Sequence, residues 1–343
     1  MSKNYYIIPI FVPMQGCPHK CVFCDQNTIT GTDDIVTASK TQNVIDEYLR
    51  TIPSKSATVE VSFFGGTFTG IEEKKQRELL EVAKSYKDRK LIDNIRLSTR
   101  PDYINDHILT YLKEYGVDII ELGVQSLDNN ILLKAGRGHT KEQVEEASAL
   151  IKKYGFILGH QIMPGLPCDT FEKDIMTVNK SVIMKPDIVR IYPALVVKNT
   201  PMEKMYLQKK YSPYSLDQAV FIAKEMYKIY VQNDINVIRI GLQPTENINS
   251  NADVVAGPFH PAFRELVLSS IIKDKILEIG ENENIIKIII NPKDISKLYA
   301  DKKKYFLDVK QKFKNINVVQ DSNILKGSIK VIFENLKTGI INY

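Results

Sequence analysis

The stretch Cys17-Pro18-His19-Lys20-Cys21-Val22-Phe23-Cys24 places three thiols within eight residues, at the spacing C-x3-C-x2-C. Three soft ligands on one short loop can hold three corners of an iron–sulfur cube and leave the fourth iron without a protein ligand. An iron with an open coordination position can bind a further molecule. The spacing therefore indicates chemistry as well as structure.

Two simpler explanations compete with an iron–sulfur cluster. A structural zinc site uses four ligands, usually as two separated pairs, but no second pair follows here and His19 is too close in sequence to serve easily as the fourth ligand. Disulfides are typical of small secreted chains rich in cysteine, whereas this chain has four cysteines in 343 residues. The number and spacing of the cysteines therefore favour an iron–sulfur cluster over a zinc site or unrelated thiols.

The composition is that of an ordinary globular protein, with 43% hydrophobic and 25% charged residues. No signal peptide precedes the cysteines, and no stretch approaches the roughly 18 apolar residues of a membrane span. We therefore expect a cytoplasmic protein without membrane contact. The net charge of +5 is uneven, because residues 285–343 hold twelve lysines and five acids, a net +7.

Apolar patterning predicts strands that alternate with helices along most of the chain. The expected strands are 5–14, 59–64, 95–99, 118–125, 156–163 and 187–193, and the expected helices are 41–49, 72–86, 102–115, 140–154 and 169–183. Six such repeats predict a parallel sheet with right-handed crossovers, either closed as a barrel or open as a partial one. A helix at 216–232 and a strand at 237–241 extend this unit.

We place a domain boundary in the polar run 280–284. Residues 1–280 then form the main α/β unit with its extension, and residues 285–343 form a small lysine-rich α/β appendage. In the appendage we expect strands at 285–290, 316–319 and 328–333 and a helical stretch at 295–313.

Polar and glycine residues gather where the predicted strands end, which is where parallel sheets bind ligands. The pair Gly65-Gly66, followed by Thr67, permits a close backbone approach to a ligand or simply makes a tight turn. Arg100, two residues after Ser98, can either bind a carboxylate through a bidentate pair of hydrogen bonds or form a surface ion pair.

The fourth strand ends in a second polar set. Glu121, Gly123 and Gln125 share one face and are suited either to a ribose hydroxyl or to internal hydrogen bonds. Farther along, Arg137 either reaches a cofactor or caps local carbonyls. His160 is best interpreted as a hydrogen-bonded core histidine, and Cys168 as an incidental thiol rather than a hydrogen donor.

The cysteine spacing, with Phe23 before the third cysteine, resembles the signature of the radical S-adenosylmethionine (SAM) superfamily. Within it, several motifs resemble, in order, the radical SAM domain of the elongator catalytic subunit, a family that modifies the wobble uridine of transfer RNA. These motifs are Thr99-Arg100-Pro101-Asp102-Tyr103, Glu121-Leu122-Gly123-Val124-Gln125-Ser126, Arg137-Gly138-His139-Thr140, Met163-Pro164, Leu166-Pro167, Ile191-Tyr192-Pro193 and Tyr211-Ser212-Pro213-Tyr214.

The resemblance implies a partial (β/α)6 radical SAM barrel with the small C-terminal α/β appendage. It also implies that Cys17, Cys21 and Cys24 hold a 4Fe-4S cluster. It assigns S-adenosylmethionine binding to a larger set of residues: Phe23, Gly65, Gly66, Thr67, Ser98, Arg100, Gln125 and Arg137.

The implied reaction is reductive cleavage of S-adenosylmethionine followed by hydrogen abstraction from a substrate, in transfer-RNA (wobble uridine) modification. The implied partners are transfer RNA and an electron donor such as ferredoxin or flavodoxin. The family's acetyltransferase domain has no counterpart in the appendage, so we expect a short bacterial-type relative. A radical SAM enzyme acting on a tetrapyrrole or another small metabolite, or a non-catalytic RNA-binding relative, remains an alternative.

Overall fold

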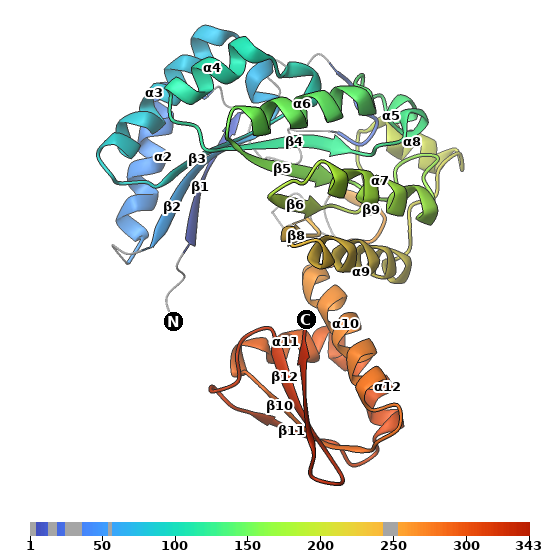
Figure 1. Cartoon of the computed structure of the whole chain (residues 1–343). Coiled ribbons are helices and arrows are strands. Elements are labelled where there is room, and N and C mark those ends of the chain that lie inside the picture. Colours follow the sequence, from blue (N-terminus) through green and yellow to red (C-terminus); the bar gives the residue numbers. More distant parts are fainter. Residues whose placement is uncertain (1–4, 13–18, 25–35, 54–56, 243–252) are drawn as a thin grey trace.

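The computed structural model describes residues 5–12, 19–24, 36–53, 57–242 and 253–343. Its main feature is a parallel sheet in the order β1-β2-β3-β4-β5-β6-β8, which curls into an open half-barrel (Figure 1). The strands are β1 (Tyr5–Val12), β2 (Thr58–Gly65), β3 (Asn94–Thr99), β4 (Ile119–Gln125), β5 (Ile157–Ile162), β6 (Ile188–Ile191) and β8 (Asn236–Ile240). The expected partial barrel is confirmed, with β8 as its seventh strand.

Helices cover the outer face of the half-barrel (Figure 1). They are α2 (Ala38–Thr51), α3 (Glu73–Asp88), α4 (Asp106–Glu114), α6 (Lys141–Lys153), α7 (Phe171–Ile183) and α9 (Leu216–Gln232). Local sequence sets their ends. Thr140 and Gln143 form a reciprocal capping box at the start of α6, and Gly155, with φ +74°, follows its end, so the helix agrees with the expected range 140–154.

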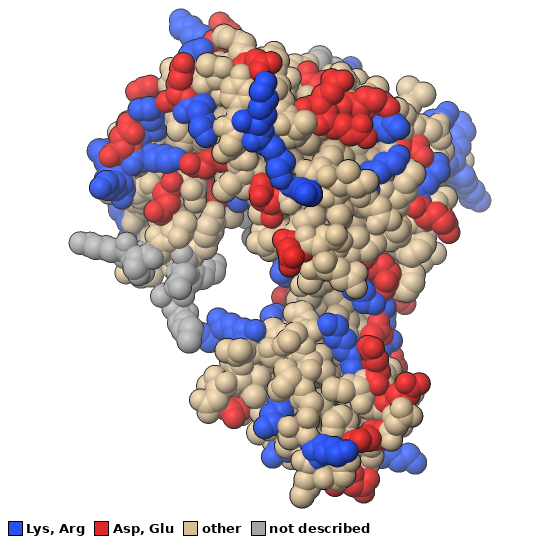
Figure 2. Space-filling view, viewed as in Figure 1, with Lys and Arg blue, Asp and Glu red and all other residues tan. Residues whose placement is uncertain are grey.

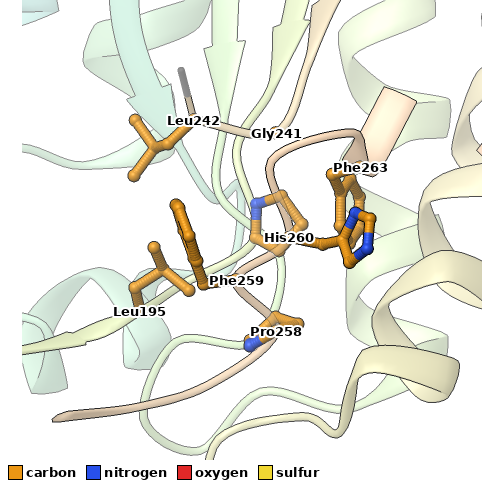
Figure 3. A pocket seen from close by; sticks show the side chains of 8 residues that line it. Leu195, Gly241, Leu242, Pro258, Phe259, His260 and Phe263 are labelled. Carbon is orange, nitrogen blue, oxygen red and sulfur yellow. The ribbon is translucent and has the colours of Figure 1, made fainter. Parts of the chain in front are cut away.

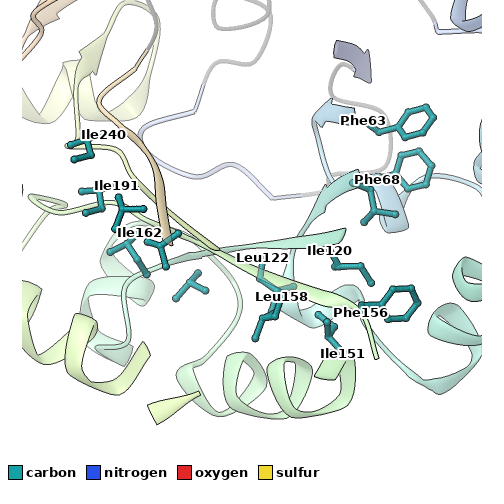
Figure 4. Close-up of a cluster of buried hydrophobic side chains, with 14 of the residues drawn as sticks. Phe63, Phe68, Ile120, Leu122, Ile151, Phe156, Leu158, Ile162, Ile191 and Ile240 are labelled. Carbon is teal, nitrogen blue, oxygen red and sulfur yellow. The ribbon is translucent and has the colours of Figure 1, made fainter. Parts of the chain in front are cut away.

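The main hydrophobic core lies between the sheet and these helices. Alternate strand residues point outward into it, and Figure 4 shows Phe63, Ile120, Leu122 and Leu158 among them. These four side chains are fully buried. Since burying one such side chain stabilises the fold by about 1.5–3 kcal/mol, the outward positions hold the barrel together and free the inward positions for polar groups.

Short elements that the sequence did not reveal complete the rim of the half-barrel. They are the 3-10 turns η1 (Phe68–Gly70) and η2 (Pro101–Tyr103), the helices α5 (Asn129–Lys134) and α8 (Pro201–Leu207), and the two-stranded ribbon of β7 (Val196–Val197) and β9 (Val254–Ala256). Each is too short to produce a clear periodic pattern in the sequence.

The C-terminal region has its own four-stranded sheet, in the order β11-β10-β12-β13. Its elements are β10 (Ile285–Ile290), η3 (Pro292–Asp294), α11 (Ile295–Leu298), α12 (Ala300–Lys312), β11 (Asn317–Gln320), β12 (Ser328–Phe333) and β13 (Thr338–Asn342). Strands β10 and β12 match the expected ranges, β11 is shifted by one residue, and β13 was missed. The expected single helix divides at Tyr299.

Helix α10 (Phe263–Ile279) connects the two regions (Figure 1). Its first half packs in the main core through residues such as Leu266 and Ile271, and its second half contributes Ile272 and Ile276 to the core of the C-terminal region. The C-terminal core therefore extends into residues before the polar run 280–284. Among the described residues, no helix has the length and apolar character to cross a membrane.

Candidate functional site

The cysteine loop lies at the rim of the half-barrel. Cys17 lies outside the described residues, whereas Cys21 is 3% exposed and Cys24 is partly buried. The Cys24 N–H donates to the Cys21 carbonyl at 3.1 Å, so the two thiols belong to one tight turn. Phe23 packs, partly buried, in a small apolar cluster that includes Leu166.

Two backbone hydrogen bonds fix this turn to the rim. The Val22 N–H donates to the Ala135 carbonyl at 3.0 Å, and the Met202 N–H donates to the Val22 carbonyl at 2.8 Å. The first ties the loop to the end of α5 and the second ties it to the start of α8. The position of the thiols is therefore set by elements that follow them by more than a hundred residues.

Arg137 joins the cysteine loop to β4. The residue is 7% exposed, its Nη1 lies 3.5 Å from Cys21 Sγ, and its Nη2 donates to the Gly123 carbonyl at 2.6 Å. The sequence offered a cofactor contact or local carbonyl capping for Arg137. The structure shows one carbonyl bond and, in addition, a contact with a thiol sulfur.

Arg100 is buried beside this group and makes a fork with a carboxylate of its own chain. Its Nε and Nη2 each donate to an Asp102 oxygen at 2.9 Å, and its Nη2 also donates to the Arg137 carbonyl. Within the described residues, Nη1 is buried without a partner. The bidentate fork that the sequence predicted for Arg100 is thus formed with Asp102, and Nη1 is left to donate to a ligand.

The surroundings of these arginines are electropositive. Burial, followed by the charge of Arg100, lowers the pKa of His19, although Asp102 lies 3.5 Å from its Nε2. Burial, then Arg137 and Arg100, lower the pKa of His139 to about 3. The His139 ring lies near the Val124 backbone, but within the described part of the chain neither ring nitrogen makes a hydrogen bond of ordinary geometry. Both imidazoles are therefore neutral near pH 7, and the site favours anionic groups.

The glycine pair ends β2 against β1. Gly65 has φ +111°, and a Cβ atom there would lie 2.7 Å from the Val12 carbonyl oxygen. The Gly66 N–H donates to the same oxygen at 2.9 Å, and Thr67 is buried. The requirement for glycine at Gly65 is therefore explained by a close approach of backbone to backbone, whether or not a ligand binds there.

Gln125 is a buried polar group at the carboxyl end of β4. It is 5% exposed, has φ +67°, and its Oε1 meets no hydrogen-bond partner in the described part of the chain. Its backbone carbonyl accepts from the Met163 N–H at 2.9 Å. Ser98 lies two residues before Arg100 on β3, partly buried. A buried amide oxygen without a partner is a suitable acceptor for a ligand hydroxyl or amine.

Glu121, in contrast, is satisfied within the protein. On the inner wall of the barrel its Oε2 lies 2.9 Å from Arg190 Nε and 3.4 Å from Arg96 Nη1, and Arg96 forms a second pair with Glu60 at 2.8 Å. Internal bonding, rather than a ribose contact, thus accounts for Glu121. Because the partners come from β2, β3 and β6, the sequence carried no local signal for this network.

His160 has the structural role that the sequence predicted. It is fully buried, and its ring nitrogens lie 3.0 Å from Ser148 Oγ and 2.9 Å from Ser181 Oγ. Burial lowers its pKa to about 3, so the ring is neutral. Cys168 is exposed in the loop after β5.

A small cavity follows the carboxyl ends of β6 and β8 (Figure 3). Its volume is about 10 Å³, roughly the room for one water molecule, and its lining includes Gly241, Phe259 and Phe263. His260 also lines it and accepts from the Ala262 N–H at 3.0 Å through Nδ1, at the start of α10. This cavity is too small for a cofactor.

The residues at the rim suit the group that the cysteine spacing implies. Cys21 and Cys24 supply soft sulfur ligands, which iron–sulfur clusters use. Close by, Arg100 Nη1 and Gln125 Oε1 are a buried donor and a buried acceptor without described protein partners. These groups match the carboxylate, amine and hydroxyl groups of a nucleoside linked to an amino acid.

Comparison with known proteins identifies the class. Residues 11–179 match the radical SAM superfamily, and residues 186–273 match the radical SAM C-terminal domain. The chain belongs to the radical SAM superfamily, a class of enzymes whose membership implies a 4Fe-4S cluster and S-adenosylmethionine.

Two relatives and one solved structure show which members are similar. The chain is 26% identical over 258 residues to the tRNA uridine(34) acetyltransferase of Methanocaldococcus jannaschii, covering 63% of this chain and 47% of that protein. It is 30% identical over 189 residues to human Elongator complex protein 3, covering 49% of this chain and 35% of that protein. The structure of Methanocaldococcus infernus Elp3 with an N-terminal deletion has a TM-score of 0.61 at 20% identity, covering 97% and 75%, and shows the same fold.

These comparisons confirm the resemblance to the elongator family drawn from the motifs. The chain spans about half the length, or less, of these two relatives. The activities in their names are those of the longer proteins.

Proposed function

We propose that this protein is a radical SAM enzyme that modifies transfer RNA at the wobble uridine. The observation that carries the catalytic part is a pair of buried polar atoms that have no hydrogen-bond partner in the described residues, Arg100 Nη1 and Gln125 Oε1. Arg100 also donates to the carbonyl of Arg137, whose own Nη1 lies 3.5 Å from Cys21 Sγ. The printed names of the relatives, which specify uridine 34 of transfer RNA, support the substrate.

The proposed roles follow from the positions of the residues. Cys17, Cys21 and Cys24 hold the cluster, which together with S-adenosylmethionine supplies a hydrogen-abstracting radical when bound. Arg100 orients the carboxylate of the cofactor through Nη1, which has no partner among the described residues, while Asp102 keeps the guanidinium in place.

A second set of residues completes the proposed cofactor site. Gln125 accepts from a ribose hydroxyl, and Ser98 lies on the neighbouring strand. Gly65, Gly66 and Thr67 shape the turn near the methionine end. The apolar cluster that includes Phe23 shields the site from water. A low-potential one-electron donor, such as ferredoxin or flavodoxin, supplies the reducing equivalent.

The catalytic part is tested by metal content and product analysis. Anaerobically reconstituted protein should bind about four irons, as thiolate-held cubanes do, and should form 5′-deoxyadenosine slowly with S-adenosylmethionine and a strong reductant. Cys21→Ala should abolish both, whereas the matched control Cys168→Ala, which changes an exposed thiol, should leave both intact. Stoichiometric zinc in place of iron would refute the proposal.

The proposed binding of transfer RNA depends on positive charge at the protein surface. The C-terminal region carries the basic excess, but its lysines are not all available: Lys304 pairs with Asp217 of α9, and the Lys312 ammonium donates to the Leu277 carbonyl at 3.1 Å. Over the face in Figure 2, basic and acidic side chains are intermixed. The exposed lysines of the α12 region for which the structure shows no ion pair, such as Lys310 and Lys314, are the better candidates for phosphate contacts.

The test therefore compares two triple variants in transfer-RNA filter binding over a range of salt. Replacing Lys302, Lys310 and Lys314 with glutamine should weaken binding and reduce the salt slope by about 2–3 units, since each lost phosphate contact removes about 0.9. The control replaces exposed lysines elsewhere on the outer helices and loops: Lys74, Lys90 and Lys153.

A strain that lacks the gene should also lose a wobble-uridine modification, detected by mass spectrometry of its transfer RNA. Absence of transfer-RNA binding at low salt, together with active cleavage of S-adenosylmethionine, would favour the small-metabolite alternative.

A further inference from the structure

The helices α5 and α8 form the protein surface that adjoins the cysteine loop. The end of α5 binds the Val22 N–H through the Ala135 carbonyl, and the start of α8 binds the Val22 carbonyl through the Met202 N–H. The Val22 side chain also packs, partly buried, in one apolar cluster with side chains of both helices. Since Val22 lies between Cys21 and Cys24, the exposed sides of α5 and α8 flank the thiols that are proposed to hold the cluster.

This surface is basic. Residues 129–134 and 201–210 hold four lysines and one acid, a net +3, and that acid, Glu203, already accepts from the Asn199 N–H at 2.9 Å. In Figure 2 basic side chains gather at the right-hand edge of the molecule, where Figure 1 places α5 and α8. Five exposed lysines here, one of them on the cysteine loop itself, form no ion pair within the described residues: Lys20, Lys134, Lys204, Lys209 and Lys210. Unpaired positive charge of this kind attracts an acidic partner.

Two exposed leucines lie among these lysines. Leu133 of α5 is 76% exposed and Leu207 of α8 is 67% exposed, whereas the neighbouring Leu132 is buried. Apolar side chains within a polar rim are typical of protein–protein interfaces. Surfaces for single-stranded RNA instead stack bases on aromatic rings, and the described part of this surface has no exposed aromatic side chain. The five lysines and the two leucines, which we call the α5–α8 patch, therefore fit an acidic protein better than RNA.

We propose that the α5–α8 patch is the docking surface for the protein that delivers electrons to the cluster, an acidic one-electron carrier such as flavodoxin. Electron transfer slows steeply with distance, so the carrier must dock beside the cysteine loop. Interfaces between redox partners are small and weak, and charge complementarity raises their rate of encounter. This inference rests on the proposed function in so far as that function requires a reducible cluster. The carrier loses one electron and the cluster gains it, and no bond forms or breaks on the patch.

The first test measures the binding of purified flavodoxin to the full-length, anaerobically reconstituted protein by surface plasmon resonance over a range of salt. Glutamine at three lysines of the patch should weaken binding about tenfold at low salt and flatten its salt dependence: Lys134, Lys209 and Lys210. The matched control makes the same change of charge on the outer helices and loops and should bind like the wild type: Lys74, Lys90 and Lys153. Leu133→Gln combined with Leu207→Gln should weaken binding but keep its salt dependence, because the charge is unchanged.

The second test compares two reductants in the formation of 5′-deoxyadenosine from S-adenosylmethionine. Dithionite is a small molecule that needs no docking surface, so the lysine variant of the patch should keep the wild-type rate with dithionite. With flavodoxin, kept reduced by its reductase and NADPH, the same variant should need about tenfold more flavodoxin to reach half of its maximal rate.

Each outcome bears on the proposal. Flavodoxin binding by the lysine variant that equals binding by the wild type overturns it, and so does a wild-type protein that is active with dithionite but binds no flavodoxin. Weaker transfer-RNA binding by the lysine variant, with flavodoxin binding unchanged, assigns the patch to RNA and also overturns it. If the lysine variant loses activity with both reductants, the leucine variant decides, and unchanged flavodoxin binding by that variant overturns the proposal. A wild-type protein that holds no cluster refutes the proposed function itself, which separates the two failures.

Discussion

Replacing Arg96 with methionine should be among the most damaging single changes in this protein. Arg96 is 4% exposed on the inner wall of the barrel, and Glu60 and Glu121, its two carboxylate partners, are 0% and 2% exposed. Its Nε and Nη2 bind Glu60 at 2.8 and 2.9 Å, and its Nη1 lies 3.4 Å from Glu121. Methionine fills similar space but leaves Glu60 as an uncompensated buried charge.

The expected loss follows from that charge. Breaking a buried ion pair by removing one partner costs about 3–5 kcal/mol, and Arg96 serves two carboxylates. Glu121 keeps its contact with Arg190 at 2.9 Å, so most of the loss should arise at Glu60. The double variant Arg96→Met with Glu60→Gln should therefore recover part of the stability, with a coupling of about 0.5–3 kcal/mol.

Urea denaturation of the wild type, both single variants and the double variant measures this cycle. Lys84→Met is the control, because the Lys84–Asp88 pair is exposed on α3 and its loss should leave the denaturation midpoint unchanged. The reasoning fails if Arg96→Met costs less than about 1 kcal/mol, or if the two single effects simply add.

Two further predictions concern the first turn of α7 and the end of β2. Burial, and then the neighbouring Asp169, raise the pKa of Asp174 well above its usual value. The protonated carboxyl therefore stabilises the fold in acid, and this contribution is lost as pH rises above the unfolded pKa. Asp174→Asn, which can still accept the 3.0 Å hydrogen bond from Tyr214, should raise the melting temperature at pH 8 but not at pH 4, and an equal gain at both pH values would contradict this. Gly65→Ala should destabilise the protein by about 1–3 kcal/mol, since φ +111° and a 2.7 Å approach to Val12 both exclude a side chain; a melting temperature equal to that of the wild type would show that β1 shifts freely.

Much of the fold was predictable because its signals are local. Alternating apolar strands and amphipathic helices follow from side-chain periodicity, which predicted the parallel α/β sheet. Periodicity left open whether the sheet closes, and the partial barrel was implied by the family resemblance. The cysteine spacing likewise lies within eight residues and needs no tertiary information. The short rim elements, such as α5 and α8, were missed because a few residues cannot show a period.

By itself, then, the sequence determined the cluster motif, the class of fold and the core role of His160. Only the tertiary structure decided which polar side chains are already satisfied. It pairs Glu121 with Arg96 and Arg190, and it places Arg137 on Cys21, residues that are 116 positions apart in the chain. Periodicity in the sequence indicates on which face of a strand a residue lies. Which residue it contacts depends on the register between strands and on the packing of the loops, and both are set by the whole barrel.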